Sequence, residues 1–80
     1  MKCVYLIQSK SHPDQIYVGI TKDLRYRLKA HNFGQSPHTS KYRPWELLVA
    51  LKFTDDQKAI KFERYLKSGS GQAFLNRHFK

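Results

Sequence analysis

Hydrophobic side chains gather in two short segments near the start of the chain, with polar residues between them. The segments Lys2–Gln8 and Gln15–Ile20 are rich in β-branched and aromatic residues, which favour strands. The polar connection, residues 9–14, includes the turn-forming pair Pro13-Asp14. The pattern therefore predicts two strands joined as an antiparallel hairpin.

A helical segment and a polar loop follow the hairpin. Thr21 or Asp23 can cap a helix that runs to about Asn32, because both side chains accept hydrogen bonds from free backbone N–H groups. Gly34 suits the end of this helix. Residues 35–43 are polar and basic, and we expect them to form a loop.

The second half of the chain predicts one more strand and a long helix. Pro44 introduces the apolar run Trp45–Phe53, which has the length and composition of a third strand. Residues Thr54–Gln57 have the spacing of a capping box. We therefore expect a helix that begins there and runs to about Ser68.

The end of the chain predicts a short last helix. Gly69 suits the C-terminal cap of the preceding helix, Ser70 can cap the next element, and Gln72–Phe79 is that element. The order ββαβαα predicts an α/β (α+β) fold, with a small three-stranded, mostly antiparallel sheet flanked by helices. Because 80 residues leave no room for a second core, we expect one domain over residues 1–80. The order of the strands stays open.

The charge of the chain points to a polyanionic partner. Fifteen Lys and Arg face six Asp and Glu, a formal net charge of +9. Such an excess attracts nucleic acid. Membrane attachment is not expected, since no long apolar run or signal peptide is present. The single cysteine, Cys3, cannot form an internal disulfide and fits a reducing, cytoplasmic compartment.

One acidic residue stands apart from the others. The other five lie in a turn, at helix starts or at the start of a strand, whereas Glu63 lies in the middle of a helix. On a helical wheel it falls between Ala59 and Ile60, on the side that Phe62 and Leu66 complete. A carboxylate at the border of an apolar face is costly unless something pairs with it.

Two interpretations of Glu63 stay open. It can form a partly buried salt bridge with Arg27, Arg64 or a lysine. It can also bind a hard divalent ion such as Mg²⁺, which often takes only one or two protein carboxylates.

The first helix carries two candidate functional residues. Arg27 and His31 lie one turn apart, in the same arc of the wheel as Leu24 and Leu28, so we expect both beside the sheet. Arginine binds phosphate oxygens, and histidine transfers protons near neutral pH. The alternatives are a structural arginine at the edge of the core and an inert histidine.

The two tyrosines of the hairpin complete the set. Tyr5 and Tyr17 are ordinary strand aromatics, yet either phenol can act as a hydrogen-bond partner, general base or nucleophile. Gly19 faces the same side of its strand as Tyr17, and its missing side chain allows another group to approach closely.

In this order the motifs resemble a GIY-YIG nuclease domain, in particular the small single-domain branch. Val4-Tyr5-Leu6 stands at the first motif, which lacks the glycine and isoleucine, and Tyr17-Val18-Gly19 at the second. The resemblance covers roughly Lys2 to Asn76, and the nuclease domain of the excision-repair endonuclease is similar. The spacing to the later candidate residues also agrees: Leu24, Arg27, His31 and Glu63.

The resemblance implies a mechanism. Glu63 would hold one divalent ion, Mg²⁺ or Mn²⁺, and the ion would stabilise the leaving 3′ oxygen. Arg27 would bind the scissile phosphate. Tyr17 or Tyr5 would activate or orient the attacking water, and His31 would assist proton transfer.

The resemblance also implies contacts to the substrate. Asn76 would be a phosphate-binding asparagine, and either His38 or Lys41 would fill a further position in the loop before the third strand. From the residues themselves, the loop's basic side chains and Tyr42 would grip a nucleic-acid backbone. The candidate substrate-binding residues are therefore Lys41, Tyr42, Arg43 and Asn76, with Lys67, Arg77 and Lys80 as further basic contacts.

We therefore expect a metal-dependent endonuclease that hydrolyses DNA phosphodiesters, structure-specific or repair-related, with DNA preferred to RNA. The alternative is a nucleic-acid-binding module that does not cut. The oligomeric state stays open, a homodimer included. The enzyme hypothesis makes a geometric claim, namely that five side chains line one concave, positive surface: Tyr5, Tyr17, Arg27, His31 and Glu63.

Overall fold

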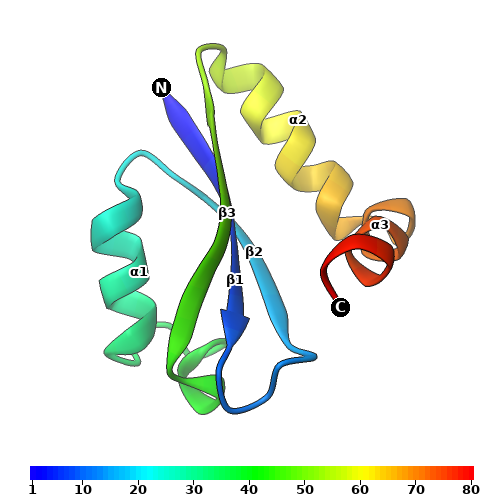
Figure 1. Cartoon of the computed structure of the whole chain (residues 1–80). Coiled ribbons are helices and arrows are strands. Elements are labelled where there is room, and N and C mark those ends of the chain that lie inside the picture. Colours follow the sequence, from blue (N-terminus) through cyan, green and yellow to red (C-terminus); the bar gives the residue numbers. More distant parts are fainter.

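A three-stranded sheet lies between two layers of helices in the computed structural model, which describes residues 1–80. The strands run in the order β2-β1-β3, and both pairs are antiparallel. Figure 1 shows α1 on one side of the sheet and α2 with α3 on the other. The expected order ββαβαα is confirmed, with these bounds: β1 Lys2–Ser9, β2 Ile16–Thr21, α1 Leu24–Asn32, β3 Trp45–Phe53, α2 Asp56–Lys67 and α3 Gly69–Phe79.

The central strand β1 is covered on both faces. Val4, Tyr5, Leu6 and Ile7 are four consecutive buried residues, as expected of a strand with helices above and below it. Successive side chains point to opposite faces. Val4 and Leu6 therefore pack toward α2 and α3, while Tyr5 and Ile7 pack toward α1.

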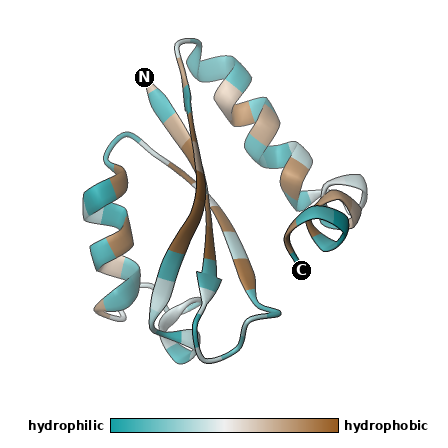
Figure 2. Cartoon of the chain, viewed as in Figure 1, coloured by the Kyte–Doolittle hydropathy of each residue, from teal (hydrophilic) through white to brown (hydrophobic).

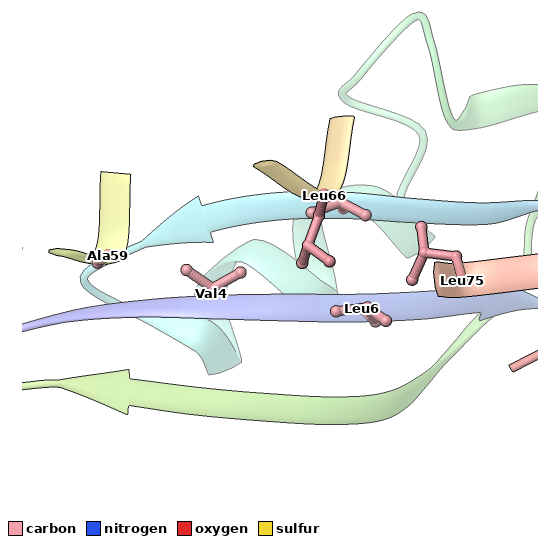
Figure 3. Close-up of a cluster of buried hydrophobic side chains, with 6 residues drawn as sticks. Val4, Leu6, Ala59, Leu66 and Leu75 are labelled. Carbon is pink, nitrogen blue, oxygen red and sulfur yellow. The ribbon is translucent and has the colours of Figure 1, made fainter. Parts of the chain in front are cut away.

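The larger core lies between the sheet and the C-terminal helices. Figure 3 shows side chains from β1, α2 and α3 meeting above the strands. In Figure 2 the apolar residues are continuous along parts of the strands and recur at intervals along the helices, as expected for amphipathic helices on a sheet. The buried members of this core are Val4, Leu6, Val18, Ala59, Leu66 and Leu75.

A smaller cluster fills the α1 face. Tyr5, Ile7 and Trp45 are buried there, and apolar side chains of α1 pack against them. The Asn32 side chain fixes the end of α1 to the start of β3, because its Oδ1 accepts from the Trp45 backbone N–H at 2.6 Å and its Nδ2 donates to the Trp45 carbonyl at 3.1 Å. This clamp holds α1 close to β1.

The N-terminal cap of α2 differs from the expected capping box. Asp55, not Thr54, is the cap: its Oδ1 accepts from the backbone N–H groups of Gln57 and Lys58 at 2.9 and 3.4 Å. The carboxylate bonds two free N–H groups and also favours the positive end of the helix dipole. The cap of α1 is the second of the two expected candidates, Asp23, which accepts from the Tyr26 N–H.

The junction of α2 and α3 lies earlier in the chain than the sequence pattern predicts. Ser68 ends α2 and also caps α3 by accepting from the Gly71 N–H at 3.2 Å, so Gly69 and Ser70 are already helical. A side chain at Gly71 would overlap the backbone of Tyr65 and Leu66. The glycine therefore lets α3 pack directly on the last turn of α2.

The connection between α1 and β3 contains one turn of 3-10 helix, Ser40–Tyr42, which the loop expectation did not include. Gly34 follows α1 with a φ of 77°, as expected of a glycine after a helix. None of the three helices is both long enough and apolar enough to cross a membrane.

The capping difference is testable. Replacing Asp55 by alanine (Asp55→Ala) removes the acceptor of two helix N–H groups, and we expect the free energy of unfolding to fall by about 1 kcal/mol. Thr54→Ala is the matched control and should change it by less than about 0.5 kcal/mol. Urea unfolding followed by the fluorescence of the buried Trp45 measures both; equal losses would contradict the assignment.

Candidate active site

Aromatic rings from both strands of the hairpin meet a histidine of α1. The ring of Tyr5 lies 6.4 Å from that of Tyr17, and His31 lies 5.9 and 5.0 Å from them, centroid to centroid. Gly19 stands opposite Tyr5 on β2, and a Cβ there would overlap the Tyr5 hydroxyl. The expectation that this glycine allows a close approach is correct, and the group that approaches is the phenol of Tyr5.

A buried hydrogen-bond chain runs from the sheet to the loop. The Tyr5 hydroxyl lies 2.9 Å from Nε2 of His31, and Nδ1 of His31 lies 2.8 Å from Oγ1 of Thr39. The three residues are between 0 and 1% exposed. Burial makes an unpaired polar group costly, so this chain fixes the orientation of the imidazole.

The tautomer of His31 follows from its partners. The Thr39 hydroxyl lies 3.5 Å from the Ser36 carbonyl, a group that can only accept, so we assign the hydroxyl as donor to Ser36 and its oxygen as acceptor from His31. Nδ1 of His31 then carries the proton and donates to Thr39, and Nε2 accepts from the Tyr5 O–H. In this arrangement Nε2 is the position that can take a proton from Tyr5.

Burial keeps both Tyr5 and His31 neutral. It raises the pKa of Tyr5; the nearby cations Arg27 and Lys67 act in the opposite direction. Burial also lowers the pKa of His31, and the charge of Arg27 lowers it further. At neutral pH the imidazole is therefore a free base next to a phenol that keeps its proton.

Arg27 is the cation of the site. Its Nε is buried and has no hydrogen-bond partner, which is unusual for a charged donor. Arg27 and His31 also line a hollow of about 140 Å³. An arginine that lines a hollow is suited to bind a phosphate oxygen through its guanidinium group.

This hollow contains only part of the candidate set, so the claim of one shared concave surface stays a prediction. Of the five candidates only Arg27 and His31 line it; Tyr5 is buried, and Tyr17 and Glu63 lie outside its wall. The tyrosines are held within the sheet layer by packing, which sequence spacing does not reveal.

Glu63 is paired with a lysine one turn further along α2. Its Oε2 lies 2.6 Å from Nζ of Lys67, and the Glu63 side chain is only 14% exposed. The hydrogen bond to Glu63 raises the pKa of Lys67. Of the interpretations left open, the salt bridge to a lysine is the one present in the free protein, whereas Arg27 and Arg64 are not its partners.

Lys67 joins Glu63 to the tyrosines. Its Nζ lies 5.7 Å from the centroid of the Tyr17 ring, and its charge acts on the Tyr5 hydroxyl. α2 packs on the opposite face of the sheet from α1 (Figure 1), and Lys67 of α2 still contacts the ring of Tyr17 on the edge strand β2. The ammonium group of Lys67 therefore lies near both the Glu63 carboxylate and the Tyr17 ring.

The expected substrate contacts are distributed over two regions. Lys41 lies 5.4 Å from the Tyr42 ring, Tyr42 packs against the α1-face cluster, and Arg43 lies over Gly34. His38 is exposed in the same loop. Asn76 is exposed on α3, in the other helical layer, and no hydrogen bond links it to the cluster.

Two residues of the cluster are not assigned to it by the sequence pattern. Lys67 follows Glu63 by four positions, which is a signal that helical pairing rules provide. Thr39 has no such signal, because its contact with His31 depends on how the loop after α1 folds back. No group of three His, Cys, Asp or Glu side chains suited to a metal is present.

With this geometry in place, comparison with known proteins defines the class. Residues 1–77 match the family described as the GIY-YIG catalytic domain, and the chain belongs to this family. The resemblance expected from the Tyr5 and Tyr17 motifs is thereby confirmed, as is the enzyme class, a GIY-YIG-type nuclease domain.

Similar proteins fall into two groups. The structure-specific endonuclease subunit slx1 of Talaromyces marneffei is 36% identical over 67 residues, which are 76% of this chain and 17% of that protein. The UPF0213 protein YazA of Bacillus subtilis is 36% identical over 64 residues, 79% of this chain and 63% of that protein. The UPF0213 protein SAG0778 of Streptococcus agalactiae is 34% identical over 61 residues, which are 75% of this chain and 69% of that protein. The chain thus spans a minor part of the slx1 protein and most of the length of the UPF0213 proteins.

The buried histidine makes stability depend on pH. Because the pKa of His31 is lowered on folding, the unfolded chain takes up a proton first as the pH falls below the ordinary value of 6.5. The free energy of unfolding should therefore fall on acidification, by up to about 1.4 kcal/mol per pH unit. The loss levels off once the pH is below the lowered pKa of the folded state.

Urea unfolding between pH 7.5 and 5 measures this slope. His31→Gln should abolish most of it, while His38→Gln, at an exposed histidine, should leave it unchanged. An equal slope in His31→Gln and the parent protein would contradict the assignment.

Proposed function

We propose that this chain is a metal-dependent endonuclease that hydrolyses phosphodiester bonds in structured DNA. The observation that carries the proposal is the pair of buried hydrogen bonds that joins Tyr5 to His31 and His31 to Thr39. It lies next to Arg27, whose Nε has no hydrogen-bond partner. Proton transfer and phosphate binding are the two demands of phosphodiester hydrolysis, and these groups meet both.

The names of relatives support the choice of reaction and substrate. The slx1 proteins are called structure-specific endonuclease subunits, and this chain aligns with part of them. A chain with a net charge of +9 is suited to bind a polyanion. We therefore propose the same reaction for this chain, with DNA preferred to RNA as the substrate. We propose one such domain over residues 1–80.

Arg27 is assigned to the scissile phosphate. Its guanidinium group donates to a phosphate oxygen, and its charge stabilises the negative charge that builds up as the new bond forms. Replacing arginine by lysine would remove the planar arrangement of donors and not only the charge.

Tyr5 and His31 are assigned to proton transfer. A proton leaves the attacking water for the Tyr5 oxygen while the Tyr5 proton moves to Nε2 of His31, which is already 2.9 Å away. The imidazolium that forms keeps its other proton on Nδ1, and this N–H donates a hydrogen bond to Thr39. Tyr17, which is less buried than Tyr5, orients the water.

Glu63 is assigned to the divalent ion. Its carboxylate already attracts a cation, the ammonium group of Lys67, so the position suits positive charge. A single carboxylate fits Mg²⁺ or Mn²⁺, which complete their shells with water and substrate oxygens. When bound, the ion supplies charge stabilisation for the leaving oxygen.

The remaining contacts complete the proposal. The loop side chains Lys41, Tyr42 and Arg43 lie next to the α1 face and would grip the backbone on that side of the site. Asn76 would contact a phosphate from α3. The free thiol of Cys3 fits a reducing, cytoplasmic location, and whether the protein works as a monomer or a homodimer is left to measurement.

A cleavage assay tests the reaction. Purified protein is incubated with nicked, flapped, branched and linear DNA and Mg²⁺ or Mn²⁺, and we expect cutting of the branched or flapped substrates. Glu63→Gln should reduce the rate about a hundredfold or more, because the ligand of the ion is lost. Glu46→Gln, at the only other glutamate, is the matched control and should cut normally.

The same assay distinguishes an endonuclease from the alternative, a module that binds nucleic acid without cutting it. A protein that binds DNA in a salt-dependent manner but cuts none of the substrates is a binding module on a nuclease fold. Cleavage that Glu63→Gln leaves unchanged would contradict the assignment of that residue.

Thr39 is proposed as a positioning residue that acts through His31. Thr39→Val keeps the volume and removes the acceptor of the Nδ1 proton, so we expect the rate to fall about ten- to a hundredfold. The acid limb of the pH–rate profile should move to lower pH, because the imidazolium loses a hydrogen-bond acceptor. Thr39→Ser should restore the rate and the profile; a rate loss without a change in profile would indicate a purely structural role.

A further inference from the structure

A second hollow lies on the outer side of the C-terminal helices, away from the tyrosine cluster. Its volume is about 310 Å³. One face of α3 supplies most of the wall, with residues spaced three or four positions apart, and α2, which precedes α3 (Figure 1), supplies Tyr65. The lining residues are Tyr65, Ser70, Ala73, Phe74, Arg77 and His78.

The aromatic side chains of this hollow are open to solvent. Tyr65 is 44% and Phe74 37% exposed, although α3 already buries Leu75 in the core. The ring of His78 lies 4.7 Å from that of Phe74, centroid to centroid. Three rings therefore border one hollow, and Tyr65 and Phe74 stay partly exposed although Phe74 also packs beside the core. Exposed apolar groups that gather at one place often mark a binding site.

The charge of the hollow is of one sign. Arg77 is a permanent cation, and no carboxylate lines the wall. No residue of α3 is acidic. Flat rings beside a cation suit a ligand that is both planar and anionic, and a nucleotide whose base is not paired has both properties.

We propose that this hollow binds an unpaired nucleotide of a nucleic-acid strand. A base can cover the rings only if it is free of its neighbours in a stack, so a duplex, whose bases stack on one another, leaves the rings uncovered. Ser70 offers a hydroxyl at the same wall, and Arg77 binds the phosphate. The hollow therefore selects single-stranded segments.

The position of the hollow relates it to the proposed cleavage reaction, on which this inference rests. Tyr65 lies in the chain between Glu63 and Lys67, so the hollow and the tyrosine cluster share the last turns of α2. A helix is about 10 Å across. A strand held at the hollow thus continues to the cluster after a few nucleotides, which places an unpaired segment beside the bond to be cut.

Fluorescence anisotropy of a labelled ten-nucleotide oligothymidylate tests the proposal. The measurement uses the full chain with a chelator present, so that no cutting occurs. Phe74→Leu keeps an apolar side chain but removes the stacking ring, and Arg77→Gln removes the charge. Each should weaken binding about tenfold, while the affinity for a duplex of equal length changes less than about twofold.

Matched controls come from the other end of the molecule. Phe33→Leu changes an aromatic residue that is 73% exposed, and Arg25→Gln changes an exposed cation of α1. Neither should alter oligothymidylate binding by more than about twofold. Because Arg77 lies on the surface, Arg77→Gln remains informative even if Phe74→Leu lowers stability.

The possible outcomes separate this proposal from the cleavage reaction. Equal losses in the hollow and control variants would show non-specific attraction to charge and overturn it. Normal binding by both hollow variants would overturn it as well and leave the surface to a protein partner. If the variants lose single-strand binding but the parent cuts no DNA, the hollow stands and the endonuclease proposal fails.

Discussion

A tyrosine hydroxyl at the centre of a buried strand must find a hydrogen-bond partner, and the arrangement of the α1 side follows from this demand. β1 is covered on both faces and Tyr5 is only 1% exposed in the free protein, so its hydroxyl needs a hydrogen-bond partner from the protein itself. Its partner is His31 of α1, whose second nitrogen in turn needs Thr39. Helix, strand and loop are thereby joined by two hydrogen bonds through one imidazole. The same burial that stabilises this network holds the phenol and the imidazole neutral and in line for proton transfer.

Charge is balanced differently on the other side of the sheet. Glu63 is nearly buried and pairs with Lys67, which also lies above Tyr17. An ion pair in this position holds a positive charge next to the phenols. A divalent ion at Glu63 would compete with Lys67, and a displaced ammonium would be free to contact phosphate. The salt bridge is the state that the structure contains, and the metal binding that we propose for Glu63 would replace it.

Much of this architecture could be predicted from the sequence. Trp45–Phe53 has the bounds of β3, and the hairpin strands are displaced by no more than one residue. These elements are set by local hydrophobic pattern, which one sequence carries. The α2–α3 junction differs from its prediction because Ser68 and Gly71 act together through packing of two helices, and capping preferences alone do not contain that contact. The strand order, with β1 in the centre, likewise depends on contacts distant in the chain.

The candidate site likewise contains residues that local pattern predicts and a residue that only distant contacts determine. Tyr5, Tyr17, Arg27 and His31 could be found because strand and helix periodicity places them on one face, and the structure brings their side chains together. Thr39 could not, since its approach to His31 depends on a 3-10 turn that no periodic pattern announces. Periodicity reports which face a residue occupies, whereas a hydrogen-bond network requires that every buried donor and acceptor be matched. The groups that tune an active site are therefore the ones that a sequence shows least, and counting the partners of each buried polar atom is the step that finds them.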